Sequence, residues 1–254
     1  MKFSKSVSAG VLLLLLIGWP VLMSGTRQQD LKIVAADSTV AEPPVSIPLS
    51  PEKLSELEAI SLYDSMRLKR AGLSKKAFLF AWKGYKQLLK KRRLSNDDVL
   101  SICDFSQSSR SKRMYIIDVA KKKLMLSTYV AHGRNSGREY ASSFSNKPES
   151  HKSSLGFYVT RNSYYGEHGL ALKIDGMENG INDKADARNI VIHGSDYVGA
   201  GYLRGKKFNG RSFGCPAVPK KDTQKIIHTI KGGSCLFIYH PTTYYLAKST
   251  ILNG

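Results

Sequence analysis

Hydrophobic positions recur with a helical period in the segment that follows residue 50. Ser50 and Pro51 are typical of a helix start, with a serine N-cap and a proline in the first turn. Leu54, Leu57 and Ile60 then follow at close to the 3.6-residue period. The pattern predicts a helix that runs from Pro51 to about residue 70.

A second helix is predicted after Gly72, with Ser74 as its N-cap. Its aromatic stripe, Phe78, Trp82 and Tyr85, lies on one side of the helix and is interpreted as core packing; a wall-binding surface is the alternative. A third, short helix is expected to start at residues 95–98, where serine, asparagine and two aspartates stand together.

After residue 109 the period of the hydrophobic pattern changes from 3.6 to two. Residues 113–119 and 123–130 alternate on either side of a lysine-rich turn, which predicts a β-hairpin. Further strands and one helix are separated by loops rich in glycine, serine and asparagine. The sequence therefore predicts a mainly β domain preceded by a small α-helical extension. The further strands are expected at 155–160, 171–174, 189–192 and 235–239, and the helix at 220–230.

The N-terminus carries the pattern of an export signal. Lys2 and Lys5 precede an apolar run at 11–23, and Ser24 and Gly25 follow it as small residues. The run is short for a membrane span, which takes about 20 apolar residues. We therefore expect an exported protein of the periplasm or cell envelope, with an uncleaved N-terminal anchor as the alternative. The expected segments are a signal or anchor at 1–25, a proline-containing linker at 26–50, the helical extension at 51–105 and the catalytic domain at 106–254.

The chain is strongly basic, with 39 Lys and Arg against 20 Asp and Glu and a formal net charge of +19. Such an excess favours anionic partners. Export and the lack of any zinc-finger or aromatic-platform pattern argue against nucleic acid. An anionic surface of the cell envelope is the better expectation. The sequence does not indicate an oligomeric state.

Three cysteines in an exported protein leave at least one unpaired. Cys103 and Cys235 both stand in apolar runs and are interpreted as small buried residues. A disulfide between these two is the alternative, and it would also leave Cys215 free.

Cys215 is the candidate nucleophile, and His193 is its candidate base. A thiol has a pKa of about 8.5, so at neutral pH it needs a basic or positive neighbour. His193 ends the apolar run 189–192 and is followed by Gly194, whereas Cys215 lies 22 residues later, in the turn 212–216. On spacing alone, the alternative is that a histidine and a cysteine occur 22 residues apart by chance and have no common role. A zinc site is a second one; it would need His132 or His168 as further ligands.

The segments around these two residues resemble the L,D-transpeptidases of the YkuD type. His193-Gly194 together with Ser212-Phe213-Gly214-Cys215 is similar to the family motif HG…S-x-G-C, and 211–218 is similar to the murein L,D-transpeptidase branch. The resemblance covers about residues 110–240. It implies a YkuD-like β-sandwich with a short helix.

The resemblance implies a cysteine enzyme that acts on peptidoglycan stem peptides without a metal or organic cofactor. Cys215 would attack the carbonyl of the third residue of a tetrapeptide stem, and His193 would pass the thiol proton to the departing D-alanine. The thioester would then go to an acceptor amine, which gives a 3–3 crosslink. A carboxypeptidase with water as acceptor is the alternative, as is a noncatalytic wall-binding module. Ser212 is expected beside the catalytic pair, and the backbone of Phe213, Gly214 and Cys215 is expected to bind the oxyanion.

Substrate contacts are expected from residues around the predicted cleft. The commoner family pattern has arginine or asparagine two positions beyond the cysteine, where this chain has Ala217. Arg211 or Arg204 is expected to replace that side chain, unless donor recognition differs. The other expected contacts are Gly194, Tyr158, Tyr165 and His168.

Overall fold

The computed structural model describes residues 48–167 and 169–254. The predicted signal segment at 1–25 and the linker up to residue 47 lie outside the described residues, as does His168. Residues from Pro48 to Gly254 form one unit, in which the helical segment and the sheet share a single core. No helix among the described residues has the length and apolarity that crossing a membrane takes.

The first two predicted helices are confirmed. Helix α1 (Pro51–Ser65) begins at Ser50, whose side chain accepts a hydrogen bond from the Lys53 N–H. Helix α2 (Lys75–Lys90) begins in the same way at Ser74. Helix α1 ends before the predicted residue 70.

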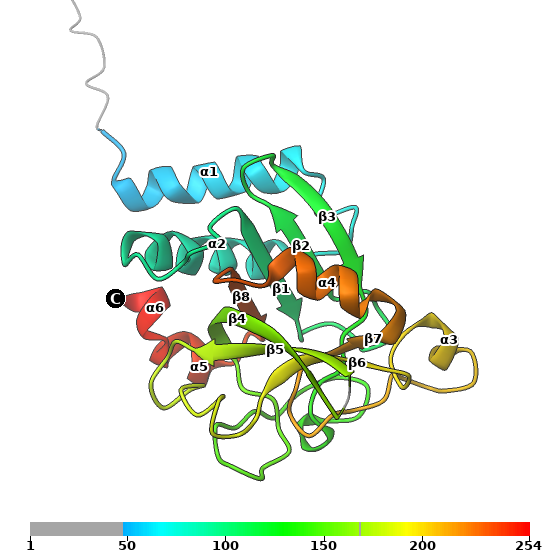
Figure 1. The fold of residues 1–254 in the computed structure, drawn as a ribbon. Coiled ribbons are helices and arrows are strands. Elements are labelled where there is room, and N and C mark those ends of the chain that lie inside the picture. Colours follow the sequence, from blue (N-terminus) through cyan, green and yellow to red (C-terminus); the bar gives the residue numbers. More distant parts are fainter. Residues whose placement is uncertain (1–47, 168) are drawn as a thin grey trace, which may run out of the picture. The chain divides into compact units, whose positions relative to one another are not determined.

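The strands form a single eight-stranded sheet in the described part of the chain, with the order β3-β2-β1-β8-β4-β5-β6-β7 (Figure 1). The predicted mainly β domain with a helical segment before it is confirmed. The predicted hairpin is β2 and β3. The sequence pattern did not predict the short strand β7. The strands are β1 (Val99–Asp104), β2 (Met114–Asp118), β3 (Lys123–Thr128), β4 (Gly156–Gly166), β5 (Gly169–Gly176), β6 (Val191–Ser195), β7 (Ala217–Pro219) and β8 (Cys235–Tyr239).

The predicted third helix near residue 95 is wrong. The chain there turns and enters β1, which pairs antiparallel with β2 and parallel with β8. All six β1 residues are buried. The helix-start signal at residues 95–98 is local, whereas the strand is stabilised by ladders to two partners that lie far away in sequence.

Helices pack on the sheet from two directions. Helix α2 packs on β1 and β8, and α1 and α6 pack on α2. Helix α4 (Thr223–Ile230) contacts β1 in one half of the sheet and β5 and β6 in the other (Figure 1). The helical segment therefore supports the half of the sheet that is remote from β6 and β7. The remaining short helices are η1 (Arg134–Ser136), α3 (Ala200–Leu203), η2 (Lys220–Asp222), α5 (Thr243–Lys248) and α6 (Thr250–Asn253).

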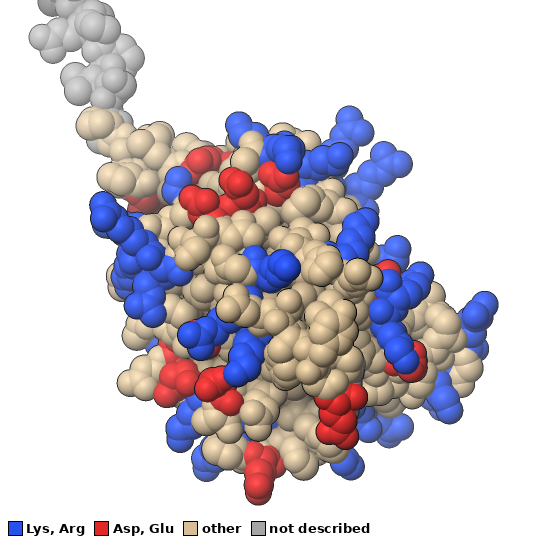
Figure 2. Space-filling model, viewed as in Figure 1, with Lys and Arg blue, Asp and Glu red and all other residues tan. Residues whose placement is uncertain are grey.

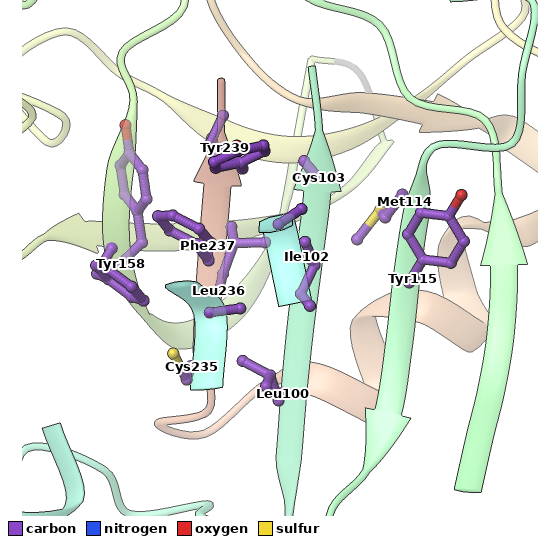
Figure 3. Close-up of a cluster of buried hydrophobic side chains, with 14 of the residues drawn as sticks. Leu100, Ile102, Cys103, Met114, Tyr115, Tyr158, Cys235, Leu236, Phe237 and Tyr239 are labelled. Carbon is purple, nitrogen blue, oxygen red and sulfur yellow. The ribbon is translucent and has the colours of Figure 1, made fainter. Parts of the chain in front are cut away.

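Cys103 and Cys235 are free and fully buried. Cys235 pairs with Leu100 across β1 and β8, so Cys103 lies three positions further along its strand. That offset is about 10 Å, whereas a disulfide needs Cα atoms within about 7 Å. Figure 3 shows Cys103 and Cys235 at different levels of the core, and both cysteines are free, so the disulfide alternative fails.

The surface carries the basic excess of the sequence. Figure 2 shows Lys and Arg side chains distributed over the visible face, with acidic side chains gathered over α1. Three glutamates of α1 form ion pairs with lysines of α1 and α2, which are Lys53–Glu56, Lys83–Glu52 and Lys86–Glu58.

A buried carboxylate joins the C-terminal helices to the sheet. Glu178 is fully buried and accepts hydrogen bonds from the Phe157 N–H at 2.8 Å and the Tyr245 hydroxyl at 3.1 Å. The Ser249 hydroxyl donates to its second oxygen. The three donors come from β4, α5 and the start of α6, so one side chain holds three elements together.

Replacement of Glu178 by alanine is expected to lower the free energy of unfolding by roughly 2–5 kcal/mol, because it leaves buried donors without an acceptor. Urea denaturation followed by circular dichroism measures the loss. Asp64→Ala, at an exposed position of α1, is the control and should stay within about 0.5 kcal/mol of wild type. A loss below about 1 kcal/mol for Glu178→Ala would contradict the assigned role.

Candidate active site

The parallel pairing of β6 with β7 places His193 directly beside Ala217. His193 also pairs with Ala171 of β5, and Ala171 pairs with Tyr164 of β4. Paired residues in a sheet share a face, whereas the next residue along a strand points to the other face. His193 therefore faces away from Ile192, which is buried in the core.

The Cys215 thiol contacts the strand that carries His193. Its Sγ lies 3.4 Å from the Val191 nitrogen, which donates to it, and 3.6 Å from the Asn189 carbonyl oxygen. Val191 stands two positions before His193, on the same face of β6. The strand rise puts these two residues about 6.6 Å apart. The structure thus brings the Cys215 thiol to the start of β6, two positions before His193 in the middle of the strand, although 22 positions separate the predicted pair in the sequence.

The Ser212 side chain braces the turn that carries the thiol. Its hydroxyl donates to the Cys215 carbonyl oxygen at 2.6 Å and accepts from the Gly214 N–H at 3.1 Å. Ser212 therefore acts on the backbone of the turn. The Gly214 N–H, predicted as an oxyanion donor, is committed to Ser212 in this arrangement, which puts more weight on the Phe213 and Cys215 N–H groups.

Gly214 is required by both backbone conformation and space. Its φ of +130° lies in the region that side chains rarely adopt. A Cβ there would lie 3.0 Å from the Lys152 carbonyl oxygen and 3.0 Å from the Ile190 side chain. The Ser153 hydroxyl also donates to the Gly214 carbonyl oxygen, at 3.3 Å. The turn is therefore packed tightly against the segment 150–154.

The orientation of His193 suits a base. Its Nδ1 lies 3.0 Å from the Gly194 carbonyl oxygen. Because a carbonyl can only accept, Nδ1 carries the proton and Nε2 keeps its lone pair. The side chain is 6% exposed, so it is held within the fold and reaches the surface only at its edge.

Opposing effects act on the thiol. Burial raises the pKa of Cys215, whereas the hydrogen bond from the Val191 N–H and the charge of Arg188 lower it. Burial also lowers the pKa of Arg188, while the charges of Tyr158 and Cys215 raise it. Arg188 is the residue near the thiol that the sequence analysis missed. It stands at the start of an apolar run, where a charged residue is normally read as a solvated strand end.

An exposed aromatic side chain lies beside the nucleophile turn. Phe213 is 63% exposed, its ring centroid lies 4.5 Å from that of His151, and the Arg134 guanidinium lies 5.6 Å from its centre. Arg211 donates to the carbonyl oxygens of Arg134 and Gly137, both at 3.0 Å. Arg211, predicted to bind substrate, therefore holds this segment in place.

The sequence matches the model of the L,D-transpeptidase catalytic domain over residues 69–239, which is more than half of the chain. The chain belongs to the L,D-transpeptidase catalytic-domain family. Family members act on peptidoglycan stem peptides. No curated protein matches the sequence.

Solved structures with a similar fold are remote. An L,D-transpeptidase from Mycobacterium smegmatis is 8% identical with a TM-score of 0.35, over 56% of this chain and 59% of that protein. The carbamoyl enzyme of Ldtfm with avibactam is 13% identical with a TM-score of 0.37, over 57% of this chain and 50% of that one. The L,D-transpeptidase from Stackebrandtia nassauensis is 13% identical with a TM-score of 0.33, over 75% and 80%. The chain thus spans little more than half of the first two, and these scores add nothing to the family match.

Ala217, where the commoner family pattern has a long polar side chain, is fully buried in β7. It packs with Ala131 and Val198 in a small apolar cluster. A longer side chain at this position would displace that cluster. Of the two expected replacements, Arg211 is held by backbone carbonyls, whereas Arg204 lies exposed at the end of α3.

Two predicted substrate contacts have other roles. Tyr158 is fully buried, and its hydroxyl donates to the Ser154 carbonyl oxygen at 3.1 Å, so this prediction is wrong: the side chain fills the core (Figure 3). A Cβ on Gly194 would lie 2.2 Å from the Thr223 hydroxyl. Gly194 therefore makes room for the start of α4. Tyr165 is 83% exposed at the end of β4. It follows Tyr164, the β4 residue that lies in line with His193 across the sheet.

His132, offered as a zinc ligand, is committed to a buried arginine. Its Nδ1 lies 2.7 Å from Arg113 Nη2, which can only donate, and its Nε2 faces the Gly137 carbonyl oxygen at 3.4 Å. Within the described residues, no group of three or more His, Cys, Asp or Glu is placed to hold a metal ion. Burial and the neighbouring Arg113 charge lower the pKa of His132 to about 3.

The neutral His132 is expected to make the fold sensitive to acid. An unfolded histidine titrates near pH 6.5, whereas the folded one stays neutral to about pH 3. Between these values the unfolded state binds more protons, so stability falls as the pH drops, by up to about 1.4 kcal/mol per pH unit. Urea denaturation at pH 7, 6 and 5 measures the slope.

His132→Asn keeps an acceptor for Arg113 but does not titrate, so its slope should be shallower than that of wild type. His228→Asn, at an exposed position of α4, is the matched control and should retain the wild-type slope. Equal slopes in wild type and His132→Asn would show that His132 is not the acid-sensitive group.

Proposed function

We propose that the protein is an exported cysteine L,D-transpeptidase that forms 3–3 crosslinks in peptidoglycan. The observation that supports this best is the contact between the Cys215 thiol and β6, two positions from His193 and on the same face. The family match supplies the substrate class, and the geometry supplies a thiol, a base and a tight glycine turn.

In the first half of the proposed reaction, the Cys215 thiolate attacks the carbonyl carbon between the third stem residue and the terminal D-alanine. His193 Nε2 accepts the thiol proton and returns it to the D-alanine nitrogen as the C–N bond breaks. The Phe213 and Cys215 N–H groups stabilise the oxyanion. The product is a thioester on Cys215, and D-alanine departs.

In the second half, the amine of another stem peptide attacks the thioester. His193 takes a proton from that amine, a new amide bond forms and the Cys215 thiolate leaves. Water in place of the amine would give a tripeptide, which is the carboxypeptidase alternative. A noncatalytic basic module that binds the wall is the second alternative, and the net charge of +19 is the feature that favours it.

Purified tetrapeptide muropeptides separate these three functions by mass spectrometry. The transpeptidase is expected to yield crosslinked dimers, the carboxypeptidase tripeptide alone, and the binding module neither product. Cys215→Ala should abolish all turnover because the nucleophile is gone. Cys103→Ala removes a buried cysteine remote from the site and is the matched control, which should retain turnover. Turnover by Cys215→Ala would overturn the nucleophile assignment.

The pairing of His193 with the thiol predicts a reactivity that does not depend on substrate. His193→Ala should slow alkylation of Cys215 by iodoacetamide at neutral pH, because the thiol loses its base. Rates measured from pH 5 to 9 show the effect, and His228→Ala should behave as wild type. Unchanged alkylation of Cys215 in His193→Ala would count against the pairing.

Export is proposed from the N-terminal pattern at residues 1–25. Cell fractionation with N-terminal sequencing of the mature protein tests it. A new N-terminus near residue 25 in the periplasmic fraction supports cleavage, whereas an intact Met1 in the membrane fraction supports an anchor.

A further inference from the structure

Arg188 lies in the turn that leads into β6, directly before the residue whose carbonyl contacts the thiol. Asn189 adopts a left-handed backbone conformation, with φ of +53°, and its carbonyl oxygen lies 3.6 Å from Cys215 Sγ. Two positions later, the Val191 N–H donates to the same sulfur. The backbone that follows Arg188 thus contacts the Cys215 sulfur at two points.

The Arg188 guanidinium joins this turn to the segment 145–154. One terminal nitrogen donates to the Ser145 carbonyl oxygen at 2.9 Å, and the other donates to the Lys152 carbonyl oxygen at 2.6 Å. The hydroxyls of Ser154 and Ser150 accept further hydrogen bonds, at 2.5 and 3.4 Å. All four acceptors are uncharged, and no carboxylate among the described residues forms an ion pair with Arg188. Its positive charge is therefore not neutralised locally.

The same guanidinium lies behind the nucleophile turn. A Cβ on Gly214 would lie 3.2 Å from Arg188 Nη2 and 3.0 Å from the Lys152 oxygen to which Arg188 donates. Gly214 is therefore packed against the Arg188–Lys152 hydrogen bond. A half-buried, unneutralised charge in such a place interacts with a thiolate more strongly than a solvated surface charge would.

We propose that Arg188 is a positioning residue that holds the segment 145–154 against the turn 212–216 and stabilises the thiolate of Cys215 by its fixed positive charge. The inference deepens the proposed function, since it rests on Cys215 as the nucleophile. The guanidinium suits this role because its planar fork binds several carbonyls at once and stays charged when half-buried.

Among the described residues, three ionisable side chains lie around the thiol. Arg188, in the turn before β6, and Tyr197, in the loop after it, interact electrostatically with Cys215, and the Cys215 charge contributes to a raised pKa of Tyr197. His193 stands on β6, two positions beyond the residue that donates to the thiol. Arg188 is the only one of the three that is positive at neutral pH without taking up a proton. Its removal should therefore raise the thiol pKa and leave the thiolate scarcer at neutral pH.

The test is the pH dependence of Cys215 alkylation by iodoacetamide, with the labelled residue located by mass spectrometry. Cys103 and Cys235 are fully buried and serve as internal controls for the folded state. Arg188→Gln should raise the midpoint of the rate profile by about one pH unit or more. Arg188→Lys, which keeps the charge but loses the fork, should lie closer to wild type. Arg161→Gln removes an exposed arginine that pairs with Asp175, and it should leave the midpoint unchanged.

An unchanged midpoint in folded Arg188→Gln would overturn the inference. If Arg188→Gln does not fold, the inference is tested by a second measurement on the wild-type protein. The ratio of iodoacetate to iodoacetamide rates at Cys215 should be higher in the native protein than in urea, because a fixed positive charge attracts the anionic reagent. A ratio no higher than in urea would equally overturn the inference.

The alkylation experiment separates this inference from the proposed function. A wild-type protein that turns over no muropeptide, but whose thiol midpoint depends on Arg188, supports the inference and overturns the proposed enzyme. Turnover of muropeptide, together with a thiol midpoint that does not change in Arg188→Gln, supports the proposed enzyme and overturns the inference.

Discussion

The parallel pairing of β6 with β7 is the interaction on which the site depends. It is a ladder of three residue pairs, and it places His193 beside Ala217. Because strands in parallel register advance in the same direction, the residue two positions before Ala217 comes level with Val191, and that residue is Cys215. Gly194 makes this pairing possible, because a side chain at that position would clash with the start of α4 on the other face of the strand. The arrangement of the candidate pair, His193 and Cys215, is thus set by strand register, and hydrogen bonds within the turn then fix the direction of the thiol.

Two arginines, the buried Arg113 and the half-buried Arg188, stabilise the loops around this ladder, and neither forms an ion pair with a carboxylate in the described part of the chain. Arg113 is fully buried and donates to the Val130 and Gln107 carbonyl oxygens and to His132. Arg188 does the same for the segment 145–154. Isolated buried charge is costly, but a guanidinium that finds several backbone acceptors offsets much of that cost and crosslinks the segments that supply them. In both cases two of the acceptors are backbone carbonyls outside the named strands, and side chains of His132, Ser150 and Ser154 supply the others.

The helical segment and the candidate site lie at different parts of the sheet. Helix α2 packs on β1 and β8, in the middle of the strand order, whereas the candidate site lies at β6 and β7, at one end of it. The aromatic stripe of α2, with Phe78, Trp82 and Tyr85, is buried, in agreement with the core interpretation. The helices therefore complete the core under one half of the sheet. The candidate site lies in the loops and short strands of the other half, which the L,D-transpeptidase family match also covers.

The sequence by itself determined the features that depend on local patterns: the caps of α1 and α2, the β2–β3 hairpin, the alternating strands and the motif of His193, Ser212 and Cys215. It did not determine β1 as a strand, the three-residue β7 or the role of Arg188, and it placed Tyr158 in the cleft. These features are decided by partners distant in sequence. β1 is a strand because β2 and β8 flank it, and Tyr158 is buried because β4 pairs with β8. The contacts of Arg188 form only on folding, because the loop that contains Lys152 lies 36 residues earlier in the sequence and is brought against the guanidinium. Periodicity reports which side of an element is apolar, but only the tertiary structure decides what that side meets.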